Sequence, residues 1–229
     1  MYSATTPWSK WLDEMTEPFK KLVEKEEQFI LQLLNKDFKV LEIGSGSGRL
    51  LNAMASHVKE VVGIEYDYLQ VRESEAALGK IPNVKIIFAD GKHIPFEDGY
   101  FDLVITVFNT LGNQGYDKFR LLNEMRRVTK SGGKIILSVY AENSTEYQRE
   151  VYKKYQEMLK QHGYETVIKT IGDTTLMLSD GFPLFTSERF SKDKLARLFH
   201  DTGFTQFDIE HLTDFSYVVN AQKWAVKLA

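Results

Sequence analysis

Glycines and a carboxylate follow the first apolar run of the chain in a pattern that suits binding of a small ligand. The run Val40–Ile43 leads into Gly44-Ser45-Gly46-Ser47-Gly48, and Glu42 lies two positions before the first glycine. Glycines let the backbone turn tightly and let a ligand approach the main chain closely. The spacing, G-x-G-x-G, differs from the G-x-G-x-x-G of dinucleotide-binding turns. The segment therefore indicates a ligand other than a dinucleotide, with Glu42 available for an ammonium group; alone, it is also compatible with an ordinary loop.

A second carboxylate follows the next apolar run. Glu65 ends the segment Val61–Glu65. A carboxylate at the tip of a buried strand can accept hydrogen bonds from both hydroxyls of a ribose. Asp67 is an alternative for this role, but it is better interpreted as the N-cap of the following helix. The sequence thus favours Glu65 as the ribose ligand, although a solvated carboxylate at a strand end has the same pattern.

The loop after the third apolar run has residue types that suit an adenine ring. Asp90 can accept a hydrogen bond from an exocyclic amine, and the backbone after it, from Gly91 onward, can donate to a ring nitrogen. An apolar side chain such as Ile94 or Phe96 is expected to cover the base. His93 is interpreted as a surface histidine in preference to a catalytic base. This loop therefore predicts the adenine end of the ligand site.

Polar and aromatic residues after the fourth and fifth runs are the candidates for the reacting centre. Asn109 and Asn113 follow the fourth run, and Tyr140 and Glu142 follow the fifth. Ligands of parallel sheets bind at the carboxyl ends of the strands, so these side chains are expected near the acceptor. Turn capping by the two asparagines is equally compatible with the pattern, as is a core position for Tyr140. Asn109, Tyr140 and Glu142 are the predicted substrate-facing groups, and the sequence contains no recognisable catalytic triad.

These residues need a parallel sheet to bring them together, and the pattern of short apolar runs predicts one. Runs rich in Val and Ile, with little polar alternation, are typical of strands that are buried on both faces. Helical stretches separate them at 47–56, 68–80 and 115–129, as in right-handed strand–helix–strand units. We therefore predict an α/β, doubly wound, mostly parallel seven-stranded sheet with an antiparallel C-terminal strand and helices on both faces. The predicted strands are Val40–Ile43, Val61–Ile64, Val84–Phe88, Leu103–Val107, Lys134–Val139, Phe204–Leu212 and Phe215–Trp224.

The remaining segments divide a predicted single domain, 1–229, into four parts. Residues 1–35 are expected to be a helical lid with Tyr2, Trp8 and Trp11, divided into two helices at Pro18. Residues 36–140 form the ligand-binding core. Residues 141–186 are an insertion, with a helix at 144–162 and a hairpin around Gly172, which acts as a substrate cap or a dimer contact. Residues 187–229 supply a closing helix and two strands.

Composition excludes several classes of chemistry. The 229 residues include no cysteine, so a disulfide, a zinc–thiolate site and a cysteine nucleophile are all impossible. The net charge of −3 argues against a large nucleic-acid footprint. The first thirty residues lack the apolar core of a signal peptide, and no run is long enough to span a membrane. We expect a cytoplasmic protein without a metal site.

In their order and spacing, the four segments resemble the class I S-adenosylmethionine-dependent methyltransferases over residues 38–140, and more loosely through Lys194–Trp224. The resemblance implies S-adenosyl-L-methionine as the cofactor. It places Glu42 near the methionine moiety, Glu65 on the ribose and Phe108 in the methyl pocket. The full set of implied cofactor contacts is Glu42, Gly44, Ser45, Gly46, Gly48, Glu65, Tyr66, Asp90, Gly91 and Phe108.

The small-molecule branch of this family is the expected one. The segment Phe108-Asn-Thr-Leu differs from the Asn/Asp-Pro-Pro-aromatic signature of DNA adenine and related amino methyltransferases, and no set of metal-binding carboxylates is present. The sequence therefore predicts methylation of a nitrogen or oxygen of a small molecule, with a homodimer as one possible assembly. The alternatives are an RNA-modifying methyltransferase that uses Arg126, Arg127 and Lys130 as a basic patch, a nicotinamide-dependent oxidoreductase, and an inactive partner subunit.

Overall fold

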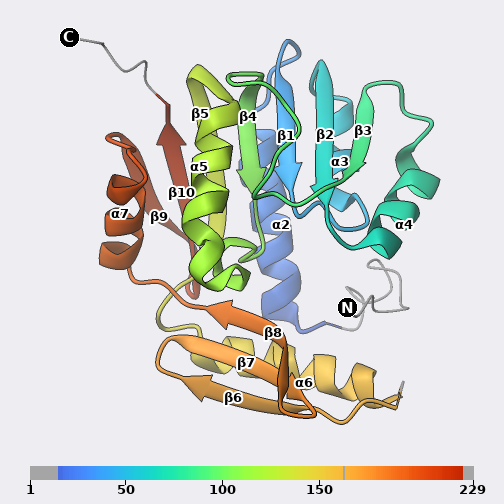
Figure 1. Cartoon of the computed structure of the whole chain (residues 1–229), viewed down its shortest axis with the longest axis vertical. Coiled ribbons are helices and arrows are strands. Elements are labelled where there is room, and N and C mark those ends of the chain that lie inside the picture. The colour runs from blue at the N-terminus through green and yellow to red at the C-terminus, as the bar shows by residue number, and fades with distance from the viewer. Residues whose placement is uncertain (1–14, 162, 224–229) are drawn as a thin grey trace.

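The computed structural model describes residues 15–161 and 163–223 and contains a large mixed sheet (Figure 1). Its seven strands lie in the order β3-β2-β1-β4-β5-β10-β9. The first five are parallel, and β10 is antiparallel to both of its neighbours. The predicted fold class is therefore confirmed. The strands are β1 (Lys39–Ile43), β2 (Glu60–Glu65), β3 (Val84–Phe88), β4 (Phe101–Thr106), β5 (Thr129–Tyr140), β9 (Phe207–Thr213) and β10 (Ser216–Gln222).

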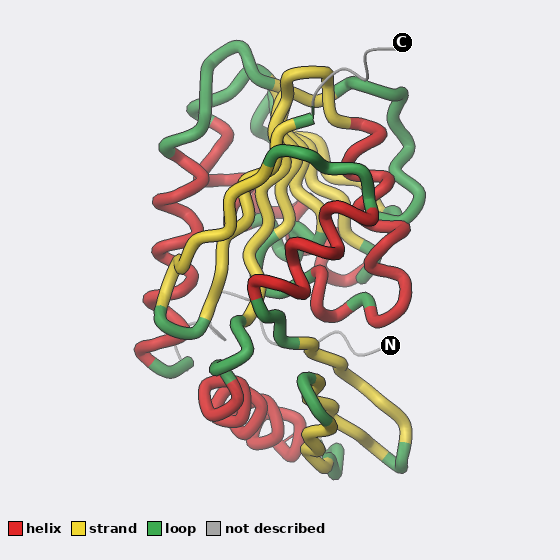
Figure 2. The backbone as a smooth tube through the Cα atoms, turned by 90° about the vertical axis from the view of Figure 1, so that its left-hand side faces the viewer, coloured by secondary structure: helices red, strands yellow, loops and turns green. Residues whose placement is uncertain are grey.

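Helices cover both faces of this sheet, as the edge-on view in Figure 2 shows. On one face, α5 (Lys118–Val128) and α7 (Lys192–Asp201) pack on alternate strand residues such as Leu41. On the other face, α2 (Glu17–Leu31), α3 (Arg49–Ala55) and α4 (Tyr68–Leu78) pack on the residues between them, such as Val40. Burial on both faces explains why these strands are almost continuously apolar. Two short 3-10 turns, η1 (Leu111–Asn113) and η2 (Gly115–Asp117), lead from β4 into α5.

Pro18 lies in the first turn of α2, where the missing backbone N–H removes no hydrogen bond. Pro18 therefore stands at the start of the second of the two predicted helices, and the predicted first helix lies mostly outside the described residues. Tyr2, Trp8 and Trp11, the predicted lid aromatics, lie outside the described residues. Within the described parts of the chain, none of the helices has the length and apolar character needed to cross a membrane.

The segment between β5 and α7 forms a separate small layer below the main sheet (Figure 1). It consists of α6 (Thr145–Gln161) and an antiparallel three-stranded sheet, β6 (Val167–Ile171), β7 (Thr174–Ser179) and β8 (Phe182–Glu188). The sequence analysis predicted the helix and the β6–β7 hairpin but not β8. Pro183 disfavours a strand assignment from sequence, but among the described residues β8 pairs with β7 alone and is an edge strand, where proline is tolerated.

A buried arginine holds this small layer together. Arg189, directly after β8, is 4% exposed. Its guanidinium donates to Gln148 Oε1 of α6 at 2.8 Å, to Thr175 Oγ1 of β7 at 2.9 Å and to the Gly172 carbonyl at 2.7 Å. Because all three acceptors are neutral, the arginine contributes through hydrogen bonds that link the helix, the central strand and the hairpin turn.

We predict that Arg189→Met lowers the free energy of unfolding by about 2–4 kcal/mol, because it removes the three hydrogen bonds of this buried arginine that link α6, β7 and the hairpin turn. Denaturant unfolding followed by circular dichroism measures the change. Arg197→Met, at an exposed position of α7, is the matched control and should cost less than about 0.5 kcal/mol. Equal effects of the two substitutions would contradict the linking role of Arg189.

Candidate active site

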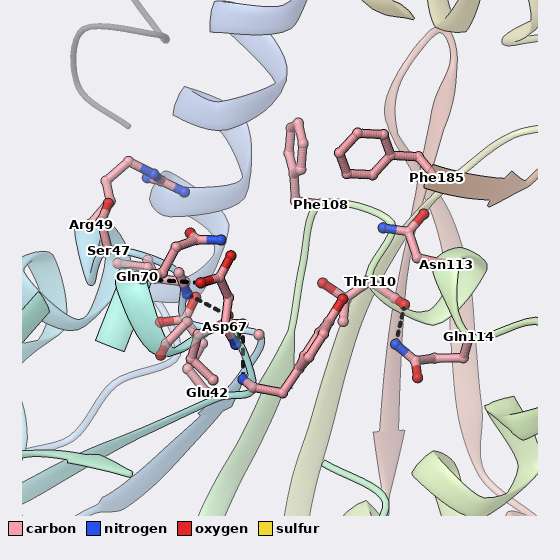
Figure 3. Close-up of a pocket in the computed structure, with 16 residues that line it drawn as sticks. Glu42, Ser47, Arg49, Asp67, Gln70, Phe108, Thr110, Asn113, Gln114 and Phe185 are labelled. Atoms are coloured by element: carbon pink, nitrogen blue, oxygen red, sulfur yellow. Dashed lines mark hydrogen bonds between the residues drawn. The ribbon is translucent and has the colours of Figure 1, made fainter. Parts of the chain in front are cut away.

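A cavity opens at the carboxyl ends of β1, β2 and β4, where the glycine segment, the tip of β2 and the turn after β4 meet (Figure 3). One strand of the small layer, β8, also reaches it. The lining residues are Glu42, Gly44, Ser45, Gly46, Ser47, Arg49, Leu50, Glu65, Tyr66, Asp67, Gln70, Phe108, Thr110, Asn113, Gln114 and Phe185.

The glycine segment is a left-handed turn between β1 and α3. Gly44, Gly46 and Gly48 have φ values of 76°, 54° and 89°, a region that side chains with a Cβ rarely adopt. At Gly48 there is also no space, since a Cβ would lie 2.4 Å from Ser74 Oγ of α4. The motif therefore sets the backbone shape of the cavity wall and the close packing of α4 behind it.

Glu65 fixes this turn from the end of β2. Its Oε2 accepts from the Gly46 N–H at 2.9 Å, and its Oε1 accepts from the N–H groups of Tyr66 and Asp67, each at 2.9 Å. Burial raises the pKa of the Glu65 carboxyl, and these three donors partly offset that rise. Asp67 accepts from the Leu69 N–H at 2.9 Å and is the N-cap of α4, as the sequence indicated.

The turn after β4 forms the opposite wall. Phe108 and Asn109 have φ values of 60° and 56°, unusual for residues other than glycine. Phe108 lines the cavity, whereas the buried Asn109 does not. The Asn109 amide donates to Ser187 Oγ of β8 at 2.7 Å and to the Glu188 carbonyl at 3.2 Å, and its Oδ1 accepts from the Tyr140 N–H at 3.0 Å.

Asn109 was expected to face the reacting centre, and the structure corrects that expectation. All of the polar atoms of its side chain are engaged in linking the β4 turn to β5 and β8. Asn113, the other candidate from this turn, does line the cavity, together with Thr110 and Gln114.

Comparison with known proteins points to a methyltransferase, as do the glycine turn and the carboxylate at the end of β2. Residues 41–137 match the sequence family described as "Methyltransferase domain". Residues 41–137 are therefore similar to a methyltransferase domain, and the fold around them is that of S-adenosylmethionine-dependent methyltransferases. This assignment removes the nicotinamide-dependent oxidoreductase alternative.

The methyltransferase is similar to a ubiquinone/menaquinone biosynthesis C-methyltransferase of a Shewanella species, 28% identical over 77% of this chain and 70% of the relative. Its fold matches a methyltransferase from Methanosarcina mazei, with a TM-score of 0.64 and 22% identity over 86% of this chain and 97% of that one. It also matches a Burkholderia thailandensis 1,6-didemethyltoxoflavin-N1-methyltransferase, solved with its substrate and S-adenosylhomocysteine. That match has a TM-score of 0.59 and 13% identity, and it covers 90% of this chain and 77% of that one.

The buried carboxyl of Glu42 favours a cofactor that carries a positive charge. Its side chain is 4% exposed, lines the cavity, and carries an Oε2 atom with no hydrogen-bond partner among the described residues. Burial raises the pKa of the Glu42 carboxyl to about 8, with the nearby Arg49 acting in the opposite direction. A buried carboxylate without a partner is unfavourable. The ammonium and sulfonium charges of S-adenosylmethionine therefore fit this end of the cavity.

The predicted adenine contacts lie at the edge of the site. Tyr66 lines the cavity, and the negative charge of Asp90 contributes to the raised pKa of its phenol. Asp90 itself accepts from the Lys92 N–H at 2.9 Å and, like Gly91, is not among the lining residues. Gly91 packs so closely on β1 that a Cβ would lie 2.5 Å from Ile43 Cγ2. The adenine roles of Asp90 and Gly91 remain predictions.

The side chains expected to cover the base are directed elsewhere. Ile94 is buried in the core beneath α5, and Phe96 packs against Phe101, with 4.8 Å between ring centroids. Neither lines the cavity, because the loop after β3 turns them toward the core. His93 is exposed, in agreement with its interpretation as a surface histidine.

Tyr140 and Glu142 also lie away from the cavity lining of the methyltransferase. Tyr140 is buried between Phe108 and Tyr147, with ring centroids 6.4 and 5.4 Å away, and burial raises its pKa well above the usual value. This is the core position that the sequence left open. Glu142 is exposed and accepts from the Tyr217 hydroxyl at 3.0 Å. Their predicted substrate contacts have no support in this geometry.

Several residues at the site were not singled out from the sequence, and Phe185 and Glu26 are two of them. Phe185 lines the cavity from β8, a strand that is hard to predict from the sequence because it contains Pro183. Glu26 of α2 is 1% exposed and accepts from the Phe108 N–H at 3.0 Å. Glu26 follows Leu22 by four positions and Val23 by three, so its spacing places it on the buried stripe of α2 despite its charge.

We predict that Glu65→Ala weakens S-adenosylmethionine binding by about tenfold or more, because it removes a charged acceptor and the anchor of the glycine turn. Titration calorimetry measures the dissociation constant, and Glu75→Gln on the exposed face of α4 is the control. An unchanged affinity of the folded Glu65→Ala protein would contradict the ribose assignment.

We also predict that Glu42→Gln makes the cofactor-free protein more stable at pH 8 while it weakens cofactor binding. The ordinary pKa of 4.5 rises to about 8 on folding, so the folded state binds more protons between these pH values. The free energy of unfolding therefore falls as pH rises through this window.

Without the Glu42 carboxyl, its contribution to the pH dependence of the free energy of unfolding disappears. Between pH 5 and pH 8 the free energy of unfolding of the variant should therefore rise by about 2–4 kcal/mol relative to that of wild type. Denaturant unfolding at the two pH values measures this gain. Glu26 titrates in the same direction and should leave a residual slope. Parallel stability profiles of variant and wild type would show that the Glu42 carboxyl is not protonated in the folded protein.

Proposed function

We propose that this methyltransferase transfers the methyl group of S-adenosylmethionine to a nitrogen or oxygen of a small molecule that contains a flat ring. The observation that carries the proposal is the pair of aromatic side chains at the cavity, Phe108 from the turn after β4 and Phe185 from β8. Their rings lie beside each other in Figure 3, on the wall opposite the glycine turn. Aromatic side chains favour offset-stacked or edge-to-face contact with planar rings, so they suit a ring-containing acceptor.

The polar groups near these rings favour an acceptor that is already nucleophilic. Thr110, Asn113 and Gln114 line this side of the cavity and are neutral, whereas the lining carboxylates Glu42 and Glu65 belong to the β1 and β2 side. Methyl transfer from a sulfonium is an in-line displacement in which the cofactor supplies the electrophile. The protein then has to align the acceptor and exclude water, and a nitrogen acceptor can release its proton to solvent.

In this proposal the small layer is a substrate cap. Residues 36–140 bind the cofactor, the described part of 1–35 covers Phe108 through α2, and residues 187–229 complete the sheet. The insertion, predicted at 141–186, ends with β8 at Glu188 and contributes Phe185 to the cavity. That contribution favours a cap over a dimer contact.

Carbon methylation is the second candidate. The Shewanella relative is named as a quinone-biosynthesis C-methyltransferase, and a quinol ring also fits between aromatic side chains. A ring carbon becomes nucleophilic when a neighbouring hydroxyl loses its proton, so this reaction depends more strongly on a base than nitrogen methylation does. The Burkholderia structure, in contrast, belongs to an enzyme named for methylation of a ring nitrogen.

The test is product identification with methyl-labelled S-adenosylmethionine. We expect label in a small ring compound when the protein is incubated with panels of ring amines, phenols and quinols, and carbon NMR of the product distinguishes N-, O- and C-methyl groups. Phe185→Ala should raise the KM for that acceptor about tenfold or more and leave the cofactor dissociation constant unchanged.

Phe182→Ala is the matched control, since Phe182 lies on the same strand and is 75% exposed. It should leave both constants unchanged. Label in RNA and none in small molecules would overturn the proposal. A C-methyl product would instead select the second candidate.

A further inference from the structure

We propose that Glu26 is a positioning residue for methyl transfer, which sets the Phe108 ring in the cavity by holding the Phe108 backbone from α2. The inference rests on the proposed acceptor site and deepens it. It assigns a role in the reaction to the N-terminal helix, whose described residues do not line the cavity themselves.

The Glu26 carboxyl, the Phe108 N–H and the Ser138 hydroxyl are all hydrogen-bonded to one another. Glu26 Oε1 accepts from the Phe108 N–H at 3.0 Å and from the hydroxyl of Ser138 on β5. The same Phe108 N–H also reaches Ser138 Oγ at 2.9 Å. The peptide plane at the start of the left-handed turn is therefore fixed from α2 and from β5 at once.

The ring of Phe108 is held by the same helix. Phe19 lies seven positions before Glu26, which places both on one face of α2. Its ring meets that of Phe108 edge-on, with 4.7 Å between centroids and 68° between planes. Because α2 contacts both the backbone and the side chain of Phe108, it determines the direction in which that ring faces the cavity.

A carboxyl at this position is costly, which argues against a role in packing alone. Glu26 Oε2 has no hydrogen-bond partner among the described residues, and burial raises the pKa of the Glu26 carboxyl to about 7. Arg49 of α3 lowers this pKa, while Glu42 of β1 and the tyrosines Tyr140 and Tyr147 are the other titratable groups close enough to interact. An apolar residue of similar size fills such a site at lower cost.

The alternative is that the Glu26 carboxyl only stabilises the fold. Strain in the turn makes it possible to test this alternative against a role in positioning the Phe108 ring. Phe108 and Asn109 both have positive φ, so the turn needs partners that oppose its relaxation. Asn109 is held by β5 and β8, but the Phe108 N–H depends on Glu26 and Ser138. Without Glu26, Ser138 Oγ of β5 is left as the acceptor of the Phe108 N–H, so the ring should be held less firmly while the sheet stays folded.

The experiment compares Glu26→Gln, which keeps an acceptor oxygen, with Glu26→Ala, which does not. Glu24→Gln, an exposed position of the same helix, is the control. We expect Glu26→Ala to bind S-adenosylhomocysteine within about threefold of wild type and to lose tenfold or more in kcat for the acceptor identified above. Glu26→Gln should retain most of the activity.

The second readout does not require an acceptor. In the wild-type protein the Phe108 amide proton should shift in NMR spectra as pH is varied around 7. The shift should persist in Glu24→Gln and be absent in Glu26→Gln and Glu26→Ala. A Phe108 amide that does not respond to these substitutions overturns the inference, whatever the acceptor is.

Equal loss of activity in the Gln and Ala variants, in proportion to loss of thermal stability, would also overturn it, because that result describes a structural carboxyl. Failure of the proposed acceptor class alone is distinguishable. In that case the Phe108 amide still responds to Glu26, while Phe185→Ala has no effect on turnover.

Discussion

The left-handed turn at Phe108 and Asn109 is the constraint on which the site depends. Two successive residues with positive φ are unfavourable, and they persist because hydrogen bonds hold them from three directions. The Phe108 N–H is held from α2 and β5, and the Asn109 side chain is held from β5 and β8. The N-terminal helix, the main sheet and the small layer therefore meet at one peptide segment. A displacement of any of them changes the position of the ring that lines the cavity.

Buried carboxyls are the second organising feature. Their burial lowers the stability of the folded protein, but the carboxyls form part of the functional site. Glu26, Glu42 and Glu65 are all at most 6% exposed, and burial raises the pKa of each. Three backbone donors partly offset the raised pKa of Glu65, whereas Glu42 and Glu26 each keep an oxygen with no hydrogen-bond partner among the described residues. Arg49 lowers the pKa of both carboxyls without cancelling the effect of burial. A cofactor with a sulfonium and an ammonium group would bring further positive charge to this side of the cavity.

The sequence carries local information well and long-range information poorly. Strands β1, β2 and β4 are predictable because burial on both faces makes them largely apolar. The glycine turn is predictable because its positive φ values favour glycine. Asn109 was misjudged, since an amide after a strand has the same appearance whether it faces a ligand or binds Ser187, which is 78 positions away. Glu26 was missed because it is charged, although its spacing places it on the apolar stripe of α2. Strand β8 was missed because Pro183 disfavours a strand.

The match to the methyltransferase family ends at residue 137, before the small layer begins. The two halves of the cavity therefore have different origins in the sequence. Residues inside the matched region form the glycine turn, the β2 carboxylate and the Phe108 ring, whereas Phe185 comes from outside it. Strand β8 therefore contributes in two ways, since Ser187 holds the Asn109 side chain and Phe185 lines the cavity. A substitution at Phe185 changes the cavity wall directly, whereas one at Ser187 acts through the turn that positions Phe108.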